Sequence, residues 1–439
     1  MQLFEEACER FRSHRAKIAV LGLGYAGLPL ACTFAEAGFG VTGFDTDVRK
    51  VQEISRGQSY IAHIDSQWIK RLVASGNLRA TSQFELLSSC DAAIICVPTP
   101  LADGRSPDLR FIVETTRAVQ ARLHRGQLVV LESTTYPGTT DEVVLPILAE
   151  SGLKPGEDFF LAFSPEREDP ANKDFNTRTI PKIVGGVTAQ CLSVASAAYG
   201  EVVERIVPVS SARVAEAAKL LENIYRCVNI AMINELKLLF ERMKIDTWEV
   251  VKAASTKPFG FTPFYPGPGL GGHCIPVDPF YLSWKAHQYD FQTRFIELAG
   301  EINTAMPAHV VERVADGLNL QGKPLKNARV LLIGVAYKRN VDDVRESPAL
   351  AIIRLLHSRL ARVQYHDPLV PLLRSRHLER EMRSVELTQE SLEAVDVVVV
   401  VTDHAAVDYG LIVRNARLIV DTRNAMAAYR SANDNVLLA

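Results

Sequence analysis

The sequence lacks the features that mark several common classes of protein. Its seven cysteines are thinly spread and form no Cys-x-x-Cys pair, which argues against a zinc or other metal site and against a disulfide framework. The apolar runs are too short to span a bilayer, and the N-terminus lacks the basic segment and apolar core of a secretory signal. The net charge is only -2, so nothing biases the chain toward nucleic acid or acidic membranes. We therefore expect a cytoplasmic protein that binds neither nucleic acid nor membrane.

At 439 residues the chain is too long for a single hydrophobic core. Up to about residue 200, short apolar runs alternate with helix-like stretches, which predicts a parallel, doubly wound sheet. Residues 212–243 contain neither Pro nor Gly and repeat apolar residues at helical spacing, so we expect one long helix. A second alternation begins near residue 320. The predicted fold class is α/β, with two Rossmann-like doubly wound domains, residues 1–205 and 320–439, joined by a long-helix central domain, residues 206–319.

A glycine pattern near the N-terminus predicts a dinucleotide site. Gly22-x-Gly24-x-x-Gly27 directly follows the apolar run at residues 18–21 and opens a predicted helix. The first glycine permits the turn, the second lets the backbone approach pyrophosphate, and the third lets helix and strand pack. Asp45 ends the next strand, where a carboxylate bonds a ribose 2′-hydroxyl and repels a 2′-phosphate, which favours NAD over NADP. A tight turn without a ligand is the alternative.

Further residues are candidates for binding the same cofactor. Arg49 follows Asp45 closely enough to contact the adenosine, although a solvated helix position is the alternative. Two polar motifs, CVPTP at residues 96–100 and ESTTYPGTT at 132–140, follow two more predicted strands. The carboxyl ends of strands are where open α/β sheets bind ligands. For the hydroxyls in these motifs, capping of the following helix is the competing interpretation. The additional candidates are Tyr25, Ala26, Pro98, Thr99, Ser133 and Thr134.

One cysteine stands in a setting suited to covalent chemistry. Cys274 follows glycines at 267, 269, 271 and 272, a loop poor in side chains that a substrate can approach closely. Lys219 and Asn223 share one face of the predicted long helix and would stabilise an oxyanion formed near Cys274. Lys219 would also favour the reactive thiolate, and Asp278 is a candidate base for activating water. Taken singly, each has a structural alternative: a solvated lysine, a packed asparagine and a small buried cysteine.

The ordered motifs of this chain resemble a known family. The glycine fingerprint, CVPTP, ESTTYPGTT, SPER, AEAAKLLEN, GPGLGGHCIPVDP, GVAYKRNVDDVRESP and DTRN occur in the order typical of nucleotide-sugar 6-dehydrogenases. The resemblance covers nearly the whole chain. The stretch around GPGLGGHCIPVDP looks most like the branch that acts on UDP-N-acetylglucosamine. UDP-glucose, UDP-N-acetylgalactosamine and UDP-N-acetylmannosamine are alternative substrates, and the implied pathway makes a surface polysaccharide or lipopolysaccharide sugar.

The resemblance implies a four-electron oxidation of a sugar CH2OH to a carboxylate with two NAD+. By motif position, Cys274 matches the nucleophile, Lys219 and Asn223 the oxyanion-stabilising pair, and Asp278 the acid that handles water. Thr134 matches a threonine that positions water or the sugar, and Glu166, in SPER, a glutamate of the site. Several relatives carry a second glutamate four residues after the first. This chain has Pro170 there, after Glu168 and Asp169, and neither of these two acids is assigned a catalytic role.

The third domain is expected to hold the nucleotide half of a UDP-sugar. Lys338, Arg345 and Arg423 match family positions near the sugar nucleotide or, for Arg345, the cofactor, and their charges suit a diphosphate. Ion pairs with Asp342, Asp343 or Asp421 are the structural alternative for them. The family and the apolar circumference of the long helix also imply a homodimer. A simple two-electron alcohol dehydrogenase and a silent nucleotide-binding protein are the competing hypotheses. The remaining substrate candidates are Arg167, Phe264, Tyr265 and Gly271.

Overall fold

The computed structural model describes residues 2–61, 64–102, 106–168, 174–272, 274–429 and 435–439. The chain divides into two compact units. The first contains Met1–Glu222 and Phe280–Phe291, and the second contains Asn223–Pro279 and Gln292–Ala439. The three-domain division at residues 205 and 319 stays a prediction, because the long helix α8 (Ala212–Arg242) passes from one unit into the other.

The first unit is built on an eight-stranded sheet with the order β3-β2-β1-β4-β5-β6-β7-β8. All neighbouring strands are parallel except β6 and β7, which run antiparallel. The central strands β1, β4, β5 and β6 are buried almost throughout, as expected for a sheet covered on both faces. The strands are β1 Lys17–Leu21, β2 Gly40–Phe44, β3 Leu78–Thr81, β4 Ala92–Ile95, β5 Leu128–Leu131, β6 Phe160–Phe163, β7 Lys182–Gly186 and β8 Ile206–Val209.

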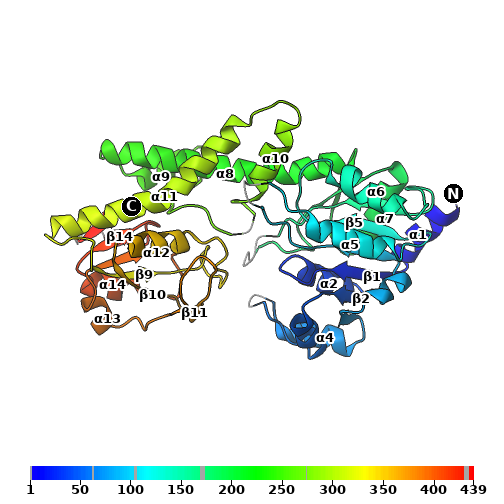
Figure 1. Cartoon of the computed structure of the whole chain (residues 1–439), viewed down its shortest axis with the longest axis horizontal. Helices are drawn as coiled ribbons and strands as arrows, with labels where there is room; N and C mark the ends of the chain where they lie inside the picture. Colours follow the sequence, from blue (N-terminus) through cyan, green and yellow to red (C-terminus); the bar gives the residue numbers. More distant parts are fainter. Residues whose placement is uncertain (1, 62–63, 103–105, 169–173, 273, 430–434) are drawn as a thin grey trace. The chain divides into compact units, whose positions relative to one another are not determined.

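Helices cover both faces of this sheet (Figure 1). One face packs against α1, α2, α4 and α7, and the other against α5, α6 and the first turn of α8. Phe11 of α1 is buried in the first of these layers, so the N-terminal residues form part of the core. The helices are α1 Gln2–Arg12, α2 Gly27–Glu36, α3 Val48–Ser55, α4 Ser66–Ala74, α5 Arg110–Gln120, α6 Leu145–Ala149 and α7 Ala189–Gly200, with single helical turns at Phe84–Ser89 and Thr140–Val144.

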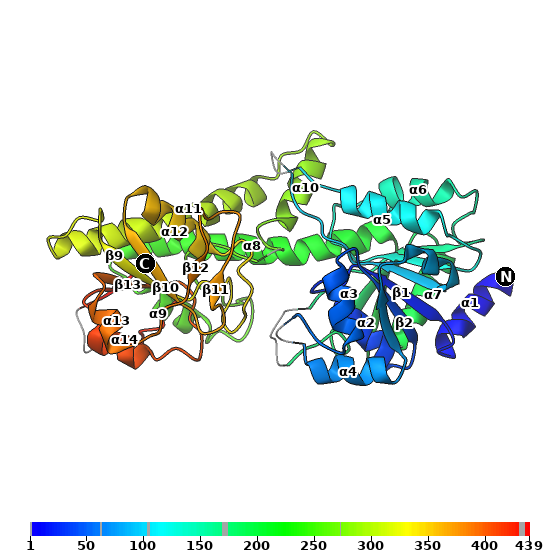
Figure 2. The ribbon, with the colours of Figure 1, turned by 60° about the horizontal axis from the view of Figure 1, so that its bottom comes forward.

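The second unit combines long helices with a five-stranded parallel sheet of order β10-β9-β13-β14-β15. Helices α11 and α12 cover one face of this sheet, and α13 and α14 cover the other (Figure 2). Its strands are β9 Arg329–Ile333, β10 Arg362–His366, β13 Val397–Val400, β14 Ile419–Asp421 and β15 Val436–Leu438, beside a small hairpin of β11 Leu372–Leu373 and β12 Met382–Arg383. Its helices are α9 Thr247–Ala254, α11 Arg294–Leu320, α12 Pro348–Ser358, α13 Gln389–Glu393 and α14 Tyr409–Asn415.

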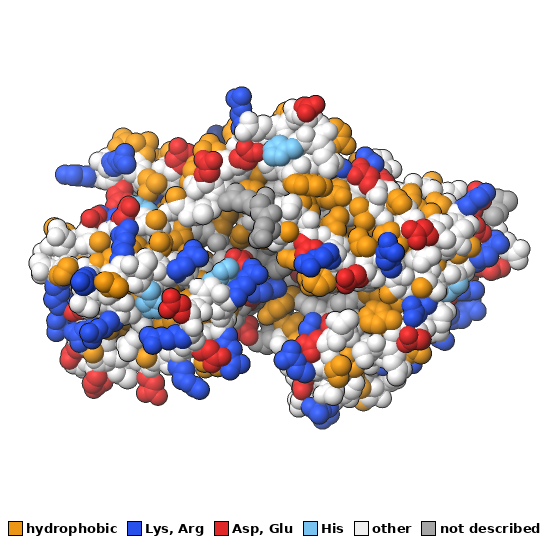
Figure 3. Space-filling model, viewed as in Figure 1, with side chains coloured by type: hydrophobic (Ala, Val, Ile, Leu, Met, Phe, Trp, Pro, Cys, Tyr) orange, Lys and Arg blue, Asp and Glu red, His pale blue; other side chains and the backbone are white. Residues whose placement is uncertain are grey.

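The predicted fold class is confirmed: two doubly wound parallel sheets are present, and the predicted long helix corresponds to α8. Lys and Arg side chains are interspersed with Asp and Glu over the face shown in Figure 3. Within the described parts of the chain, no helix is long and apolar enough to cross a membrane.

Candidate active site

The glycine loop has the geometry that a dinucleotide requires. Gly22 has φ +96°, and a Cβ there would lie 2.5 Å from the carbonyl oxygen of Cys96. A Cβ on Gly27 would lie 1.9 Å from the carbonyl oxygen of Gly22, so only glycine lets α2 start this close to β1. A Cβ added to Gly24 would meet no atom within 4 Å. The loop therefore packs tightly at its two ends and leaves open space at its middle glycine, where a pyrophosphate would approach.

Asp45 lies at the end of β2 and is 8% exposed. Its carboxylate accepts hydrogen bonds from the backbone N–H groups of Leu23 (2.9 Å) and Asp47 (2.8 Å), and Lys50 Nζ contacts it at 2.9 Å. Arg49 points away, with an 88% exposed side chain that forks onto Asp47. The sequence-based assignment named Arg49 and missed Lys50, the lysine that contacts Asp45, and the contact of Arg49 with the adenosine stays a prediction. The sequence does contain a signal for Lys50. Asp47 caps α3, and Lys50 lies in the first turn of this helix, from which its side chain reaches back to Asp45.

The two polar loops beside this site hold each other in place. The hydroxyl of Ser133 donates to the carbonyl oxygen of Val97 at 2.7 Å, so it braces one loop against the other. Thr99 is buried and its carbonyl oxygen accepts the Tyr281 hydroxyl, whereas Pro98 is exposed. Thr134 is half-buried. Tyr25 and Ala26, in the glycine loop, are also half-buried. The hydroxyl of Ser133 thus bonds the neighbouring loop, which is a different contact from the helix capping named as its alternative, and cofactor contacts in these loops stay a prediction.

A buried carboxylate that sequence reasoning missed fixes the second of these loops. Glu216 of α8 is fully buried and accepts hydrogen bonds from the backbone N–H groups of Gly138 (2.5 Å) and Thr140 (2.9 Å) and from the Thr140 hydroxyl (2.7 Å). Burial raises the pKa of Glu216 to about 7, against the lowering effect of these three donors. The residue lies one helical turn before Lys219.

Lys219 and Glu166, both predicted for the site, meet in the structure. Lys219 is 5% exposed, and its Nζ donates to the carbonyl oxygen of Glu166 at 2.5 Å and lies 4.0 Å from the Glu166 carboxylate. Arg167 is engaged elsewhere: its guanidinium contacts Glu222 at 2.6 Å and the carbonyl oxygen of Pro181 at 2.6 Å. Arg167 therefore anchors this turn to α8, and its predicted contact with the substrate stays a prediction.

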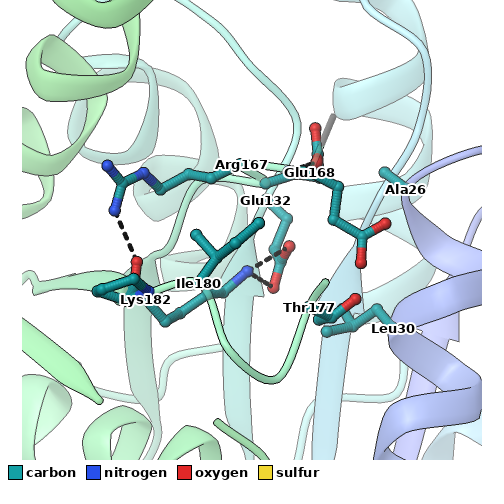
Figure 4. Close-up of a pocket in the computed structure, with 10 residues that line it drawn as sticks. Ala26, Leu30, Glu132, Arg167, Glu168, Thr177, Ile180 and Lys182 are labelled. Atoms are coloured by element: carbon teal, nitrogen blue, oxygen red, sulfur yellow. Dashed lines mark hydrogen bonds and ion pairs between the residues drawn. The ribbon is translucent and has the colours of Figure 1, made fainter. Parts of the chain in front are cut away.

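A cavity lies between this turn and α2 (Figure 4). Its volume of about 20 Å³ is enough for one water molecule. Glu168 points into it beside Thr177 and Leu30. Burial, and then repulsion from Glu166, raise the pKa of Glu168 to about 7. Asp169 and Pro170, where the sequence departs from several relatives, lie outside the described residues.

The thiol loop belongs to the second unit. Of the seven cysteines, Cys274 is exposed and the other six are buried. Its carbonyl oxygen accepts the N–H groups of Val277 (3.1 Å) and Asp278 (2.7 Å), which closes a turn leading into α10 (Asp278–His287). A helix N-terminus favours a thiolate over a thiol. Asp278 is 2% exposed and accepts a 2.6 Å hydrogen bond from Asn223 Nδ2, so two more predicted residues meet.

The glycines before Cys274 pack against the carboxyl edge of the second sheet. A Cβ on Gly267 would lie 2.6 Å from a guanidinium nitrogen of Arg423, which follows β14. A Cβ on Gly271 would lie 2.7 Å from Tyr337, which follows β9 and precedes the half-buried Lys338. Arg423 Nε donates to the Val401 carbonyl oxygen at 2.9 Å. The loop that bears the thiol is thereby fixed to the strand ends expected to bind the nucleotide.

Three other substrate or cofactor candidates have contacts within the second unit. Arg345 forks onto Asp343 at 2.7 to 3.0 Å, the ion pair named as its structural alternative. Phe264 packs edge-on against Tyr225, with ring centroids 5.6 Å apart. Tyr265 stacks on Trp248 at 5.4 Å and is 50% exposed. Tyr265 therefore keeps an accessible aromatic face, whereas Arg345 and Phe264 have the bonding of loop anchors.

The glycine loop and its acid in the first unit are typical of a dinucleotide-binding oxidoreductase, and the second unit exposes the thiol of Cys274. Comparison with known proteins agrees. The chain matches three domains of the UDP-glucose/GDP-mannose dehydrogenase family: the NAD binding domain over residues 16–203, the central domain over 213–305 and the UDP binding domain over 331–428. The chain therefore belongs to the UDP-glucose/GDP-mannose dehydrogenase family, and NAD is its cofactor.

Two curated relatives illustrate the range of the similarity. The UDP-N-acetyl-D-glucosamine 6-dehydrogenase of Pseudomonas aeruginosa is 38% identical over 356 residues, 81% of this chain and 83% of the relative. The UDP-N-acetyl-D-mannosamine dehydrogenase of Pyrococcus horikoshii is 34% identical over 415 residues, 93% of this chain and 95% of the relative. A solved structure of UDP-D-ManNAc dehydrogenase from Pyrococcus horikoshii has a TM-score of 0.86 at 32% identity, covering 96% of this chain and 98% of that one.

Proposed function

We propose that this enzyme oxidises the C6 hydroxymethyl group of a UDP-N-acetylhexosamine, with UDP-N-acetylglucosamine favoured, to the uronic acid. The main support for this proposal is the exposed thiol of Cys274. It lies in the turn that leads into α10, close to the buried Asp278–Asn223 pair. A simple two-electron alcohol dehydrogenase has no use for such a thiol. A four-electron oxidation needs one, because the aldehyde must be held covalently for the second oxidation.

The first unit fits NAD. The open space at Gly24 admits the pyrophosphate backbone, and Asp45, held by two backbone N–H groups at the end of β2, is placed for the ribose hydroxyls. Lys50 contacts Asp45 at 2.9 Å and brings a positive charge to the same position. When bound, the nicotinamide accepts one hydride from C6 in each of two successive oxidations.

Cys274 does the covalent chemistry in this proposal. Loss of a hydride and a proton converts the alcohol to the aldehyde. The Cys274 sulfur adds to the aldehyde carbon, and the resulting oxygen takes a proton, giving a thiohemiacetal. Loss of a second hydride and a proton leaves a thioester on Cys274. Water then forms a C–O bond as the C–S bond breaks, so the sum is one alcohol, two NAD+ and one water giving one carboxylate, two NADH and three protons.

Four other side chains support these steps. Lys219 and Asn223, four residues apart in α8, are proposed to stabilise the oxyanion on C6. Asp278, held by Asn223, is the proposed base for the attacking water. Thr134 and Glu166 are proposed to orient that water or the sugar. In the structure Lys219 already donates to the Glu166 carbonyl oxygen, so one cation contributes both to the turn and to the oxyanion.

A second candidate substrate is UDP-N-acetylmannosamine. It is favoured by the relative from Pyrococcus horikoshii, which covers more of this chain than the Pseudomonas aeruginosa one does. UDP-glucose and UDP-N-acetylgalactosamine are the remaining alternatives. A panel of these four UDP-sugars, each assayed for NADH formation, separates them. We expect the highest kcat/KM with UDP-N-acetylglucosamine, and a tenfold preference for another member of the panel would overturn that choice.

The variant Cys274→Ser tests the thiol directly. Serine oxygen at neutral pH is a far weaker nucleophile than a thiolate, so kcat for complete oxidation should fall by at least about 10³-fold. NADH formation and the uronic acid product are measured together by absorbance and mass spectrometry. Cys8→Ala, at a buried core cysteine of α1, serves as the matched control and should keep normal turnover. Normal conversion to the acid by Cys274→Ser would disprove the thioester route.

A further inference from the structure

Lys182 holds a buried ammonium group that none of the steps above uses. Its side chain is 7% exposed, and Nζ lies 2.9 Å from each carboxylate oxygen of Glu132 (Figure 4). The carbonyl oxygen of Pro165 lies 3.3 Å from the same Nζ. The fully buried Tyr199 of α7 donates its hydroxyl to the same Glu132 carboxylate at 2.5 Å. The Lys182 ammonium also lies over the Tyr199 ring, 5.0 Å from its centroid.

The sheet topology explains why a lysine reaches this place. Strand β7 runs antiparallel to β6, pairing Ala162 with Gly186 and Phe163 with Gly185. The first residue of β7, Lys182, therefore lies toward the edge at which the parallel strands β5 and β6 end. Glu132 directly follows β5, and Pro165 follows β6 by two residues. One ammonium group thus ties the ends of two neighbouring strands together.

These strand ends carry two of the proposed active-site residues. Glu132 is two residues before Thr134, and Pro165 is directly before Glu166. The carbonyl oxygens of Pro165 and Glu166 accept from two different lysines, Lys182 and Lys219. Two buried lysines therefore hold the backbone at Pro165 and Glu166, and one of them, Lys182, also holds the Glu132 side chain after β5.

Stability alone is a weak reason for this arrangement. A buried ion pair often contributes no more than apolar residues of similar volume, since desolvation offsets the attraction between the charges. A buried charge pair at this place therefore suggests that its directional contacts serve a purpose other than stability. Around Lys182, the charged residues facing the cavity are Glu132, Glu166, Arg167 and Glu168.

We propose that Lys182 is a positioning residue of the oxidation reaction, which fixes the distance between Thr134 and Glu166 by holding Glu132 and the Pro165 carbonyl at once. This inference rests on the proposed function. It assigns Lys182 no contact with substrate or cofactor. Its consequence is that folding and catalysis respond differently when the whole buried group is replaced by apolar side chains.

Three variants test this separation. Lys182→Met leaves the Glu132 charge buried without its partner and should lower Tm by several degrees and kcat by more than fivefold. The triple variant Glu132→Leu, Lys182→Met, Tyr199→Phe removes all three polar groups together and should regain a Tm close to that of the native enzyme. Lys154→Met, at an exposed surface lysine, is the control and should match the native enzyme in every measurement.

The decisive quantity is kcat per NAD-binding site, with sites counted by calorimetric titration so that unfolded molecules are excluded. We expect the triple variant to bind NAD normally and to remain more than fivefold slower. A triple variant within fivefold of the native rate would show that the group serves stability only. If the triple variant does not regain its Tm, the same fivefold criterion is applied to Lys182→Met at a temperature where its NAD sites are intact. A native enzyme inactive with every UDP-sugar would overturn the proposed function, and this inference with it.

Discussion

At the scale of single residues, buried carboxylates connect loops of this enzyme to its long helix, α8. Glu216 has the clearest arrangement, because three donors from the loop at residues 138–140 converge on one carboxylate that water does not reach. Desolvation nevertheless raises the pKa of Glu216 from its ordinary 4.5 to about 7. The carboxylate that holds this loop is therefore harder to ionise than an exposed glutamate.

This raised pKa predicts how stability depends on pH. Between pH 4.5 and 7 the folded state keeps a proton on Glu216 that the unfolded state has released, so the free energy of unfolding falls as pH rises. The loss is about 3 kcal/mol and levels off about one unit above pH 7. Glu216→Gln removes this titration. The stability of the native protein relative to Glu216→Gln, from urea unfolding at pH 5, 6, 7 and 8, should therefore decline between pH 5 and 7.

The exposed Glu204 provides the control for this measurement. Glu204→Gln should differ from the native protein by the same amount at every pH. If the Glu216→Gln difference is equally constant, Glu216 does not titrate in this range.

Two pairs of predicted residues, Lys219 with Glu166 and Asn223 with Asp278, are in contact in the structure. Helix spacing and the thiol loop identified Lys219, Asn223 and Asp278, and motif position identified Glu166. Glu216 and Lys182 were missed for a physical reason. The importance of Glu216 and Lys182 comes from partners more than 15 residues away, and for Lys182 also from the reversed direction of β7, which local patterns do not reveal.

At the scale of single elements, the junction between β1 and α2 is the predicted contact point for the cofactor. Gly27 is required for packing, whereas Gly24 faces open space. Gly24→Ala should therefore fold normally, with Tm within about 2 °C of native, because the added methyl meets no protein atom. The same methyl occupies space that the pyrophosphate backbone needs, so the Kd for NAD should rise at least tenfold.

Gly200 supplies the matched control. A Cβ added there would also meet no atom within 4 Å, but Gly200 lies at the end of α7. Gly200→Ala should leave the Kd for NAD unchanged. Calorimetric titration measures both variants, and an unchanged Kd for Gly24→Ala would show that the cofactor does not approach this glycine.

Element prediction succeeded where the hydrophobic signal was long or fully buried. The helix expected at residues 212–243 ends one residue earlier as α8, and the buried central strands lie where the apolar runs indicated. The edge strands β3, β8 and β15 were not anticipated. Each is short and only partly buried, so its sequence lacks the continuous apolar run that marks a central strand.

At the scale of the whole molecule, the outward side of α8 has an unusual pattern. Tyr225, Met232 and Leu239 recur every seven residues and are 46 to 50% exposed. An apolar stripe with this spacing is typical of helices that pack together. We therefore propose that two copies of the chain pair through α8 as a homodimer.

Light scattering at micromolar concentration tests the dimer. The native enzyme should have twice the mass of one chain. The double variant Met232→Lys, Leu239→Lys should have the mass of a single chain, because lysine charges would be desolvated in the interface. Leu369 is an exposed leucine that follows β10, away from α8 in the sequence, and the Leu369→Lys enzyme should remain a dimer. A monomeric native enzyme would contradict the proposal.

The number of NADH formed per UDP-sugar tests the proposed four-electron oxidation most directly. With limiting UDP-N-acetylglucosamine and excess NAD+, we predict two NADH for each UDP-sugar consumed and a single carboxylate product, with no aldehyde released. One NADH for each sugar, with an aldehyde or ketone as the final product, would contradict a four-electron oxidation on the Cys274 thiol.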